Sequence, residues 1–180
     1  LIPEQIFVLS GTQITAITDT QTTALIPTQI SALSTIQLNA LIHTLVIFTC
    51  ISYIVYSQII TLLPPEISII LPYITPIQTS YLNSDQIKAL TSDQITTLTF
   101  SQTSALTLPQ INAMTSDQIS KLKRFQINVL LLSFTPIQIS YITYDEIAAL
   151  SGSLISTIIS FISPIQIPYL IPTQISEIIP

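Results

Sequence analysis

Few residues of this chain could carry out acid–base, nucleophilic or metal chemistry, because its 180 residues include one histidine and one cysteine. His43 lies in an apolar run, where we expect a hydrogen-bonded core residue rather than a base or a metal ligand. Cys50 lies in the same run and should be a small buried apolar side chain. A single cysteine excludes an internal disulfide. We therefore predict no catalytic, cofactor-binding or metal-binding residue, and no enzyme activity.

The charged residues are few, and we interpret them as residues at helix ends. Asp145 and Glu146 are adjacent, but both fall where the positive end of a helix dipole favours acids. Lys121, Lys123 and Arg124 form one basic cluster, which we interpret as a solvated helix end rather than an anion site. Charged residues make up 7% of the chain and the net charge is −5. A nucleic-acid partner would require a basic surface, so none is expected.

Glutamine is the polar residue with a regular spacing. All sixteen glutamines fall at one position of an eight-residue repeat, and a fixed period indicates a repeat architecture. When the octad is numbered from its Ser or Thr, Thr91 is position 1, Leu98 is position 8, and glutamine is always position 4. We interpret the row as structural, with capping and amide–amide bonds, and a row of amides presented to a partner is the alternative. The row comprises Gln5, Gln13, Gln21, Gln29, Gln37, Gln58, Gln78, Gln86, Gln94, Gln102, Gln110, Gln118, Gln126, Gln138, Gln166 and Gln174.

The residue types of the octad predict one short helix per repeat. Positions 1, 4, 5 and 8 lie on one face of a two-turn helix, and positions 5 and 8 are mostly Ile and Leu. Ser or Thr at position 1 can cap the helix, and Gln at position 4 completes a capping box. Proline favours position 2, where a missing N–H costs nothing. Alanine at position 7 should let neighbouring backbones approach closely.

One long helix cannot carry this repeat, because eight residues at about 100° each rotate the apolar face by roughly 80° per octad. Short helices of this length are unstable alone and must pack against neighbouring units. We therefore predict an all-α solenoid of short two-turn helices, one per octad. A β-solenoid is the alternative, although Ile at position 5 and Leu at position 8 would then face opposite sides.

The repeat predicts a single domain over residues 1–180 with four breaks in register. The register fails over 42–54, which we interpret as a decayed, wholly buried repeat, and returns at Val55. Tetrads are inserted at 71–74, 131–134 and 159–162. Each tetrad should add about one helical turn, although Pro72 favours a loop in the first. Tyrosine at position 7 of the octad after each tetrad, namely Tyr81, Tyr141 and Tyr169, should fill the resulting gap.

Residues 41–63 are uncharged and long enough to qualify as a membrane-spanning helix. The stretch lacks basic flanks and carries His43, Ser52, Ser57 and Gln58. We therefore expect a buried repeat here, with a membrane-spanning helix as the alternative. The chain begins in register at Leu1, so we expect it to be a segment of a longer array.

Leu90 to Leu98 and Met114 to Leu122 resemble the Leu-Thr-x-x-Gln-Ile-x-Ala-Leu tracts of large bacterial surface and secreted proteins. That resemblance implies a cell-surface or secreted repeat protein. The function we expect is a non-enzymatic scaffold, spacer or interaction stalk, whose partner is another protein or a second copy. A self-assembling fibrous or membrane-associated element is the alternative, because charge is low and Ile, Thr and Gln are abundant.

Overall fold

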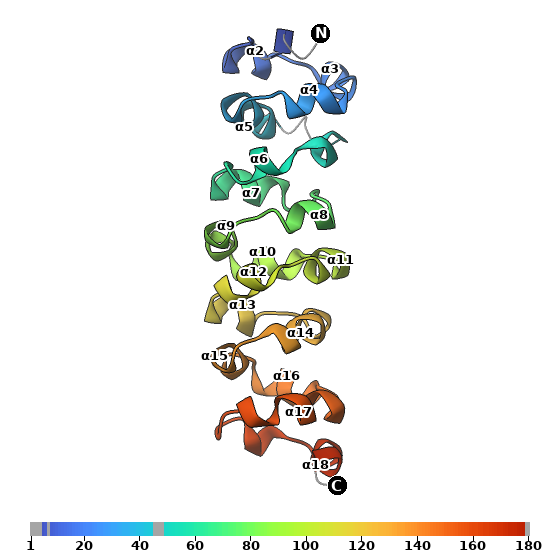
Figure 1. The fold of residues 1–180 in the computed structure, drawn as a ribbon, viewed down its shortest axis with the longest axis vertical. Helices are drawn as coiled ribbons and strands as arrows, with labels where there is room; N and C mark the ends of the chain where they lie inside the picture. The colour runs from blue at the N-terminus through green and yellow to red at the C-terminus, as the bar shows by residue number, and fades with distance from the viewer. Residues whose placement is uncertain (1–4, 7, 45–48, 179–180) are drawn as a thin grey trace. The chain divides into compact units, whose positions relative to one another are not determined.

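The computed structural model describes residues 5, 6, 8–44 and 49–178. Regular structure in these ranges is helical throughout and includes no strand, so the chain is all-α there and the β-solenoid alternative is wrong. The helices fall into two compact units, residues 1–90 and 91–180. Figure 1 shows the short helices in both units.

The described part of the first unit contains α-helices of four to nine residues and the 3-10 helix η2. Pairs of helices that are distant in sequence pack together, since α2 lies against α5, α5 against α7, and α7 against α9. The elements are α2 (Gly11–Thr15), α3 (Asp19–Thr23), α4 (Pro27–Ser31), α5 (Thr35–His43), η2 (Ile51–Tyr53), α6 (Tyr56–Ile59), α7 (Pro64–Ile70), α8 (Pro76–Thr79) and α9 (Ser84–Ala89).

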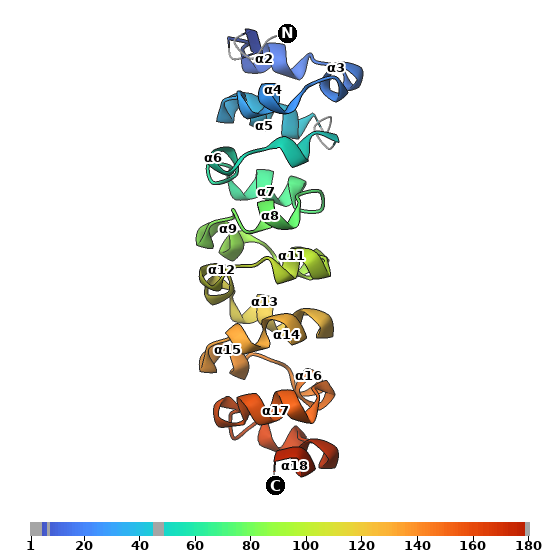
Figure 2. The same cartoon turned by 45° about the vertical axis from the view of Figure 1, so that its right-hand side comes forward.

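The second unit repeats this plan, with α10 against α13, α11 against α14, and α17 against α18. Figure 2 shows α17 beside α18. Its elements are α10 (Ser92–Thr97), α11 (Phe100–Ser104), α12 (Leu108–Ala113), α13 (Ser116–Ser120), α14 (Arg124–Leu130), η3 (Leu131–Ser133), α15 (Pro136–Ser140), α16 (Tyr144–Ala149), α17 (Gly152–Ile158), η4 (Ile159–Phe161), η5 (Ile167–Tyr169) and α18 (Pro172–Ile178).

Helix α10 shows how one octad folds. Thr91 is extended (φ −70°, ψ 159°) and its hydroxyl accepts the Gln94 N–H at 3.2 Å. The helix runs from position 2 to position 7, and Leu98 at position 8 is again extended (φ −57°, ψ 129°). The extended residues at positions 8 and 1 turn the chain into the next helix. The N-terminal signals of the sequence therefore correspond to real caps.

The core is formed by positions 4, 5 and 8 rather than by the full predicted stripe. Ile87 and Leu90 are 1% and 3% exposed. Position 1 lies mostly at the surface, as Thr91 does, because its side chain turns back to the helix N-terminus. The position-7 alanines are exposed or half-buried, as Ala89 and Ala105 are, so they do not mediate the predicted close approach.

The tetrads do not lengthen α-helices by a full turn. Residues 131–133 and 159–161 form the 3-10 helices η3 and η4, directly after the seven-residue helices α14 and α17. Residues 71–74 form a turn and a bend instead. The loop expected from Pro72 is thus confirmed.

Part of the 41–63 stretch, residues 45–48, lies outside the described residues. In the remainder, α5 ends at His43 and η2 and α6 are short. None of the described helices has both the length and the apolar composition needed to cross a bilayer. The stretch is not a wholly buried repeat either, because Ser52 and Tyr53 are exposed.

Candidate functional site: the glutamine ladder

The sixteen position-4 glutamines are called the glutamine ladder here. The amide oxygen of a ladder glutamine caps the N-terminus of its own helix. Gln86 Oε1 accepts the Asn83 N–H at 2.9 Å, and the Gln86 N–H donates to Asn83 Oδ1 at 2.8 Å. These two bonds satisfy donors that every helix N-terminus leaves free. Reciprocal capping of this kind recurs at α2, α3, α5, α8, α9, α10, α11, α13 and α15.

The amide nitrogen of the same residue bonds a distant octad. Gln86 Nε2 donates to the carbonyls of Ile59 at 2.8 Å and Leu62 at 2.7 Å. Ile59 and Leu62 hold positions 5 and 8 of their octad. Gln86 therefore makes amide-to-carbonyl bonds where the sequence analysis expected amide–amide bonds. Gln37, Gln58, Gln78, Gln126, Gln166 and Gln174 reach both carbonyls at 2.7–3.3 Å, and Gln138 reaches the position-5 carbonyl at 2.7 Å.

The separation between donor and acceptor takes two main values. Gln86 and Gln166 reach carbonyls 27 and 24 residues earlier. Gln37 and Gln126 reach carbonyls 31 and 28 residues earlier. A tetrad lies between donor and acceptor for Gln86 and Gln166, and no tetrad lies between them for Gln37 and Gln126. We call this separation the stacking interval, and it comprises either four octads or three octads and a tetrad.

Twelve of the sixteen ladder side chains are buried. Gln126 is fully buried, and Gln118, Gln166 and Gln174 are 1% exposed. Gln5, Gln13 and Gln21 are exposed and Gln94 is half-buried. Our prediction of burial is confirmed for Gln102, Gln110 and Gln118, whereas Gln94 is half-buried.

Cys50 occupies the ladder position of an octad that the sequence analysis missed. Its thiol donates to the Thr22 carbonyl at 3.2 Å, 28 residues earlier, the same separation as from Gln58 to Ile30. Ile51 and Ile54 supply the carbonyls that Gln78 binds. The octad register has therefore already returned at Cys50, earlier than the predicted return at Val55. Counting back eight residues from Gln58 would have found it.

His43 is a surface residue rather than a core residue, so our prediction for it is wrong. Its side chain is 56% exposed, and its Nε2 lies 3.3 Å from Glu66 Oε1. Glu66 takes a ladder position and is buried, and its Oε2 has no hydrogen bond. The pair joins α5 to α7. Its two groups alone make no general acid–base or metal site.

The remaining charged candidates do not converge on a site. Asp145 lies in the first turn of α16, and Glu146 has a buried Oε2 without a hydrogen bond. Lys121 at the end of α13 and Lys123 and Arg124 at the start of α14 are exposed. Nowhere in the described ranges do three or more His, Cys, Asp or Glu side chains gather as metal ligands would.

Of the tyrosines that follow the tetrads, Tyr141 and Tyr169 lie at the surface and do not fill gaps, whereas Tyr81 is half-buried. Tyr141 and Tyr169 are 36% and 44% exposed. Tyr169 instead stacks on Tyr144, with ring centroids 3.9 Å apart and planes at 2°. Tyr81 meets Tyr56 edge to face at 5.4 Å. Both pairs connect position 7 of one octad with position 2 of another, a link between octads that our sequence analysis missed.

Comparisons with protein-family models, curated proteins and solved structures found no match to this chain.

Proposed function

We propose that this chain is a non-enzymatic repeat scaffold, a solenoid that serves as a spacer or interaction stalk. The observation that carries the proposal is the double use of the ladder glutamines. Eight buried amides cap their own helix and bind backbone carbonyls of a distant octad, namely those of Gln37, Gln58, Gln78, Gln86, Gln126, Gln138, Gln166 and Gln174. Octads held to their predecessors in this way would form successive turns, which is the construction principle of solenoid proteins.

The ladder is better suited to holding turns together than to recognising a ligand. A recognition surface needs free donors and acceptors, whereas Gln86, Gln166 and Gln174 use both ends of the amide within the chain. Partner binding would therefore involve positions 2, 3 and 6, which face outward in most octads. The resemblance to bacterial surface tracts agrees with a spacer outside the cell.

Single-molecule pulling tests the scaffold directly. If equivalent turns carry the load, the chain should extend in steps of one stacking interval, about 90–115 Å of extended chain. Release of the entire chain in one step would contradict a modular spacer. A Gln86→Leu variant should lower the force of one step and leave the others unchanged, which identifies the turn that the residue holds.

A further inference from the structure

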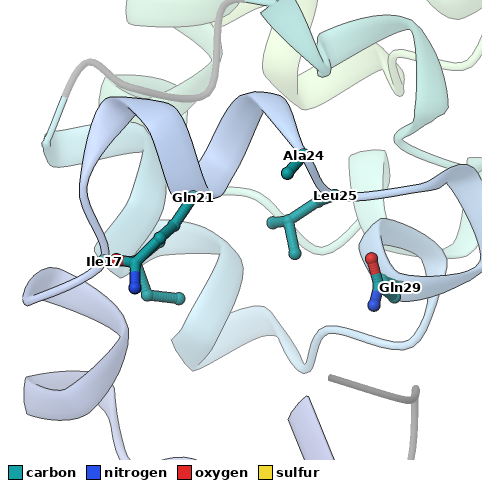
Figure 3. A pocket seen from close by; sticks show the side chains of 5 residues that line it. All are labelled: Ile17, Gln21, Ala24, Leu25 and Gln29. Carbon is teal, nitrogen blue, oxygen red and sulfur yellow. The ribbon is translucent and has the colours of Figure 1, made fainter.

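A cavity of about 270 Å³ in the first unit is lined by Ile17, Gln21, Ala24, Leu25 and Gln29. Figure 3 shows Gln21 on α3 and Gln29 on α4 at two sides of it. None of these side chains is charged or acts as an acid or base at neutral pH, so the cavity has no group that would hold an ion or catalyse a reaction. The more distinctive surface belongs to the second unit.

Charged residues are absent from three stretches of the second unit. Residues 99–114, 131–142 and 159–170 contain no Asp, Glu, Lys, Arg or His, although they make up 40 of the unit's 90 residues. Exposed apolar side chains are distributed in the opposite way, because nine of the twelve exposed large hydrophobic residues in the described part of the unit fall within these uncharged stretches. The charged residues of the unit all lie outside them, namely Asp93, Asp117, Lys121, Lys123, Arg124, Asp145, Glu146 and Glu177.

Hydrogen bonds of the glutamine ladder bring the three uncharged stretches together. Gln138 Nε2 donates to the Ile111 carbonyl at 2.7 Å, which joins the second stretch to the first. Gln166 Nε2 donates to the Ile139 and Ile142 carbonyls at 3.0 Å, which joins the third stretch to the second. Figure 2 shows α12 and α15, from the first two stretches, on its left side, and η4 of the third stretch packs against α15. The uncharged stretches are therefore neighbours in space.

The exposed apolar side chains of these stretches lie along the side of the stack. Ile137 at position 3 is 65% exposed, although its octad is bonded both to a preceding and to a following octad. Its exposure is therefore a property of position 3 and does not depend on an end of the stack. We define the apolar strip as Phe100, Leu108, Leu132, Ile137, Phe161 and Ile165, which are 45–68% exposed.

The apolar strip is large enough for a stable contact. A large apolar side chain has roughly 150–250 Å² of surface, so six such side chains at about half exposure present roughly 600 Å². Two strips packed together would bury about 1,200 Å², which is the size at which stable protein interfaces begin. Pro109, Pro136 and Pro164 are exposed beside the strip residues, and their fixed φ reduces the ordering that a contact requires.

The distribution of charge favours a second copy of the chain as the occupant. The chain has a net charge of −5, so copies repel one another in general, but no charge opposes an approach along the apolar strip. A lipid surface is less suited, because segments that lie on lipid usually carry Trp together with Lys or Arg. The chain has no Trp, and the uncharged stretches have no Lys or Arg.

We propose that the apolar strips of two copies pack face to face in a two-fold dimer. The same patch then lies on both sides of the contact, so the assembly closes at two copies. The pairing rests on the proposed scaffold and makes it a paired stalk. Because the strip runs along the side of the stack, a longer array would extend the strip rather than cover it.

Sedimentation velocity with charges placed in the strip tests the pairing. The wild-type chain should show a monomer–dimer equilibrium with no larger species. Leu132→Lys with Ile137→Lys should weaken the dimer at least about tenfold, because like charges would then be buried at the contact. Both side chains are exposed, by 67% and 65%, so the fold should be retained, and circular dichroism verifies it.

Ile36→Lys with Leu63→Lys is the matched control, because these two aliphatic side chains are 75% and 60% exposed in the first unit. It should dimerise as the wild type does. A wild-type chain that stays monomeric, dimers that survive the strip variant, or dimers lost equally in the control overturn the proposal. A monomer that floats with phosphatidylcholine vesicles also overturns it, in favour of a lipid surface.

Two measurements on the wild-type chain need no variant. Hydroxyl-radical modification of Phe100 and Phe161 should fall as the concentration rises, whereas that of Tyr144, outside the strip, should not change. Dimerisation should not weaken as salt is added, because no charge pair holds the contact. Protection confined to the charged stretches, or a dimer that salt dissociates, refutes pairing through the strip.

Failure of the pairing is distinguishable from failure of the scaffold. A monomeric chain that still extends in turn-sized steps under force keeps the scaffold and refutes the pairing. A dimeric chain that releases in one step refutes the modular spacer and keeps the pairing.

Discussion

The glutamine amide suits position 4 because its oxygen and nitrogen make different kinds of bond. The oxygen accepts from the helix cap and the nitrogen donates to carbonyls. Glutamate would keep the first bond and lose the second, and leucine would lose both. The exceptions follow this logic, since Cys50 offers one S–H and makes one bond to a carbonyl. Glutamine is thus favoured at position 4 because its amide oxygen and its amide nitrogen each make a hydrogen bond there.

Gln86→Leu tests this double role. The change strands the Asn83 N–H and the carbonyls of Ile59 and Leu62 in a buried site, so the free energy of unfolding should fall by about 1–3 kcal/mol. Urea unfolding followed by circular dichroism measures the loss. Gln13→Leu is the matched control, because Gln13 is exposed and water can replace its bonds, so its effect should stay within about 0.5 kcal/mol. Equal losses at the two sites would refute the role of the distant carbonyls.

The Tyr144–Tyr169 stack makes a separate prediction. Tyr169→Ala removes a stacked pair and should cost about 0.5–1.5 kcal/mol beyond the area lost. Tyr141→Ala is the control, since Tyr141 is similarly exposed and stacks on no ring in the described part of the chain. Urea midpoints of the two variants should differ. If both variants match the wild type, the stack contributes nothing to stability.

At the scale of elements, the lengthened helix α5 accounts for one departure from glutamine, at Glu66. Helix α5 continues to His43, and the Leu41 carbonyl accepts both the N–H and the hydroxyl of Thr44. The residue that would otherwise bind this carbonyl, 25 residues later as in the pair Gln58 and Leu33, is Glu66. With two donors already bound, the Leu41 carbonyl has no lone pair left for a ladder amide.

The helices were predictable, whereas their pairing was not. Every signal for α10 lies within eight residues, in the Thr91 cap, the acid Asp93 and Gln94 itself. The acceptor of a ladder amide is a backbone carbonyl, which every residue has, so no side chain in the sequence marks it. The sequence analysis predicted that each tetrad lengthens a helix, because the distant hydrogen-bond partners are not visible in the sequence. The substitution of a tetrad for an octad becomes visible only once the distant partner of Gln138 is known.

The tetrads therefore make a prediction about length. Gln138 binds a carbonyl in the octad that contains Gln110, so its interval is 28 residues. Gln126 binds a carbonyl in the octad that contains Gln94, so its interval is 32 residues. Deleting residues 131–134 would shorten the first interval to one that no described pair shows, so Gln138 should lose its acceptor. We expect a loss of at least about 1–3 kcal/mol in urea unfolding.

An octad in place of the tetrad is the control for that deletion. Replacing residues 131–134 by a copy of residues 83–90 gives an interval of four octads, which Gln126 already has. This variant should keep most of the wild-type stability although it changes more residues. A stable deletion variant together with an unfolded octad variant would show that the two interval lengths are not alternatives.

At the scale of the whole molecule, the ladder divides stability into local contributions. Most long-range hydrogen bonds join octads one stacking interval apart, and each compact unit contains its own set. Stability in such an array should be approximately a sum of contacts between neighbours. Local opening should then follow the stacking order rather than one global event.

Hydrogen exchange of a Gln166→Leu variant tests this locality. Gln166 binds the Ile139 and Ile142 carbonyls, both at 3.0 Å, so the variant should lose protection in α15, α16 and α17. Protection of α4, α5 and α7 in the first unit should remain that of the wild type, because the carbonyls that Gln166 binds belong to the second unit. Mass spectrometry of peptides from both units reads the two responses in one experiment. A uniform fall in protection along the chain would mean that the octads unfold as a single cooperative body, and the repeat would then be a feature of the sequence without an energetic counterpart.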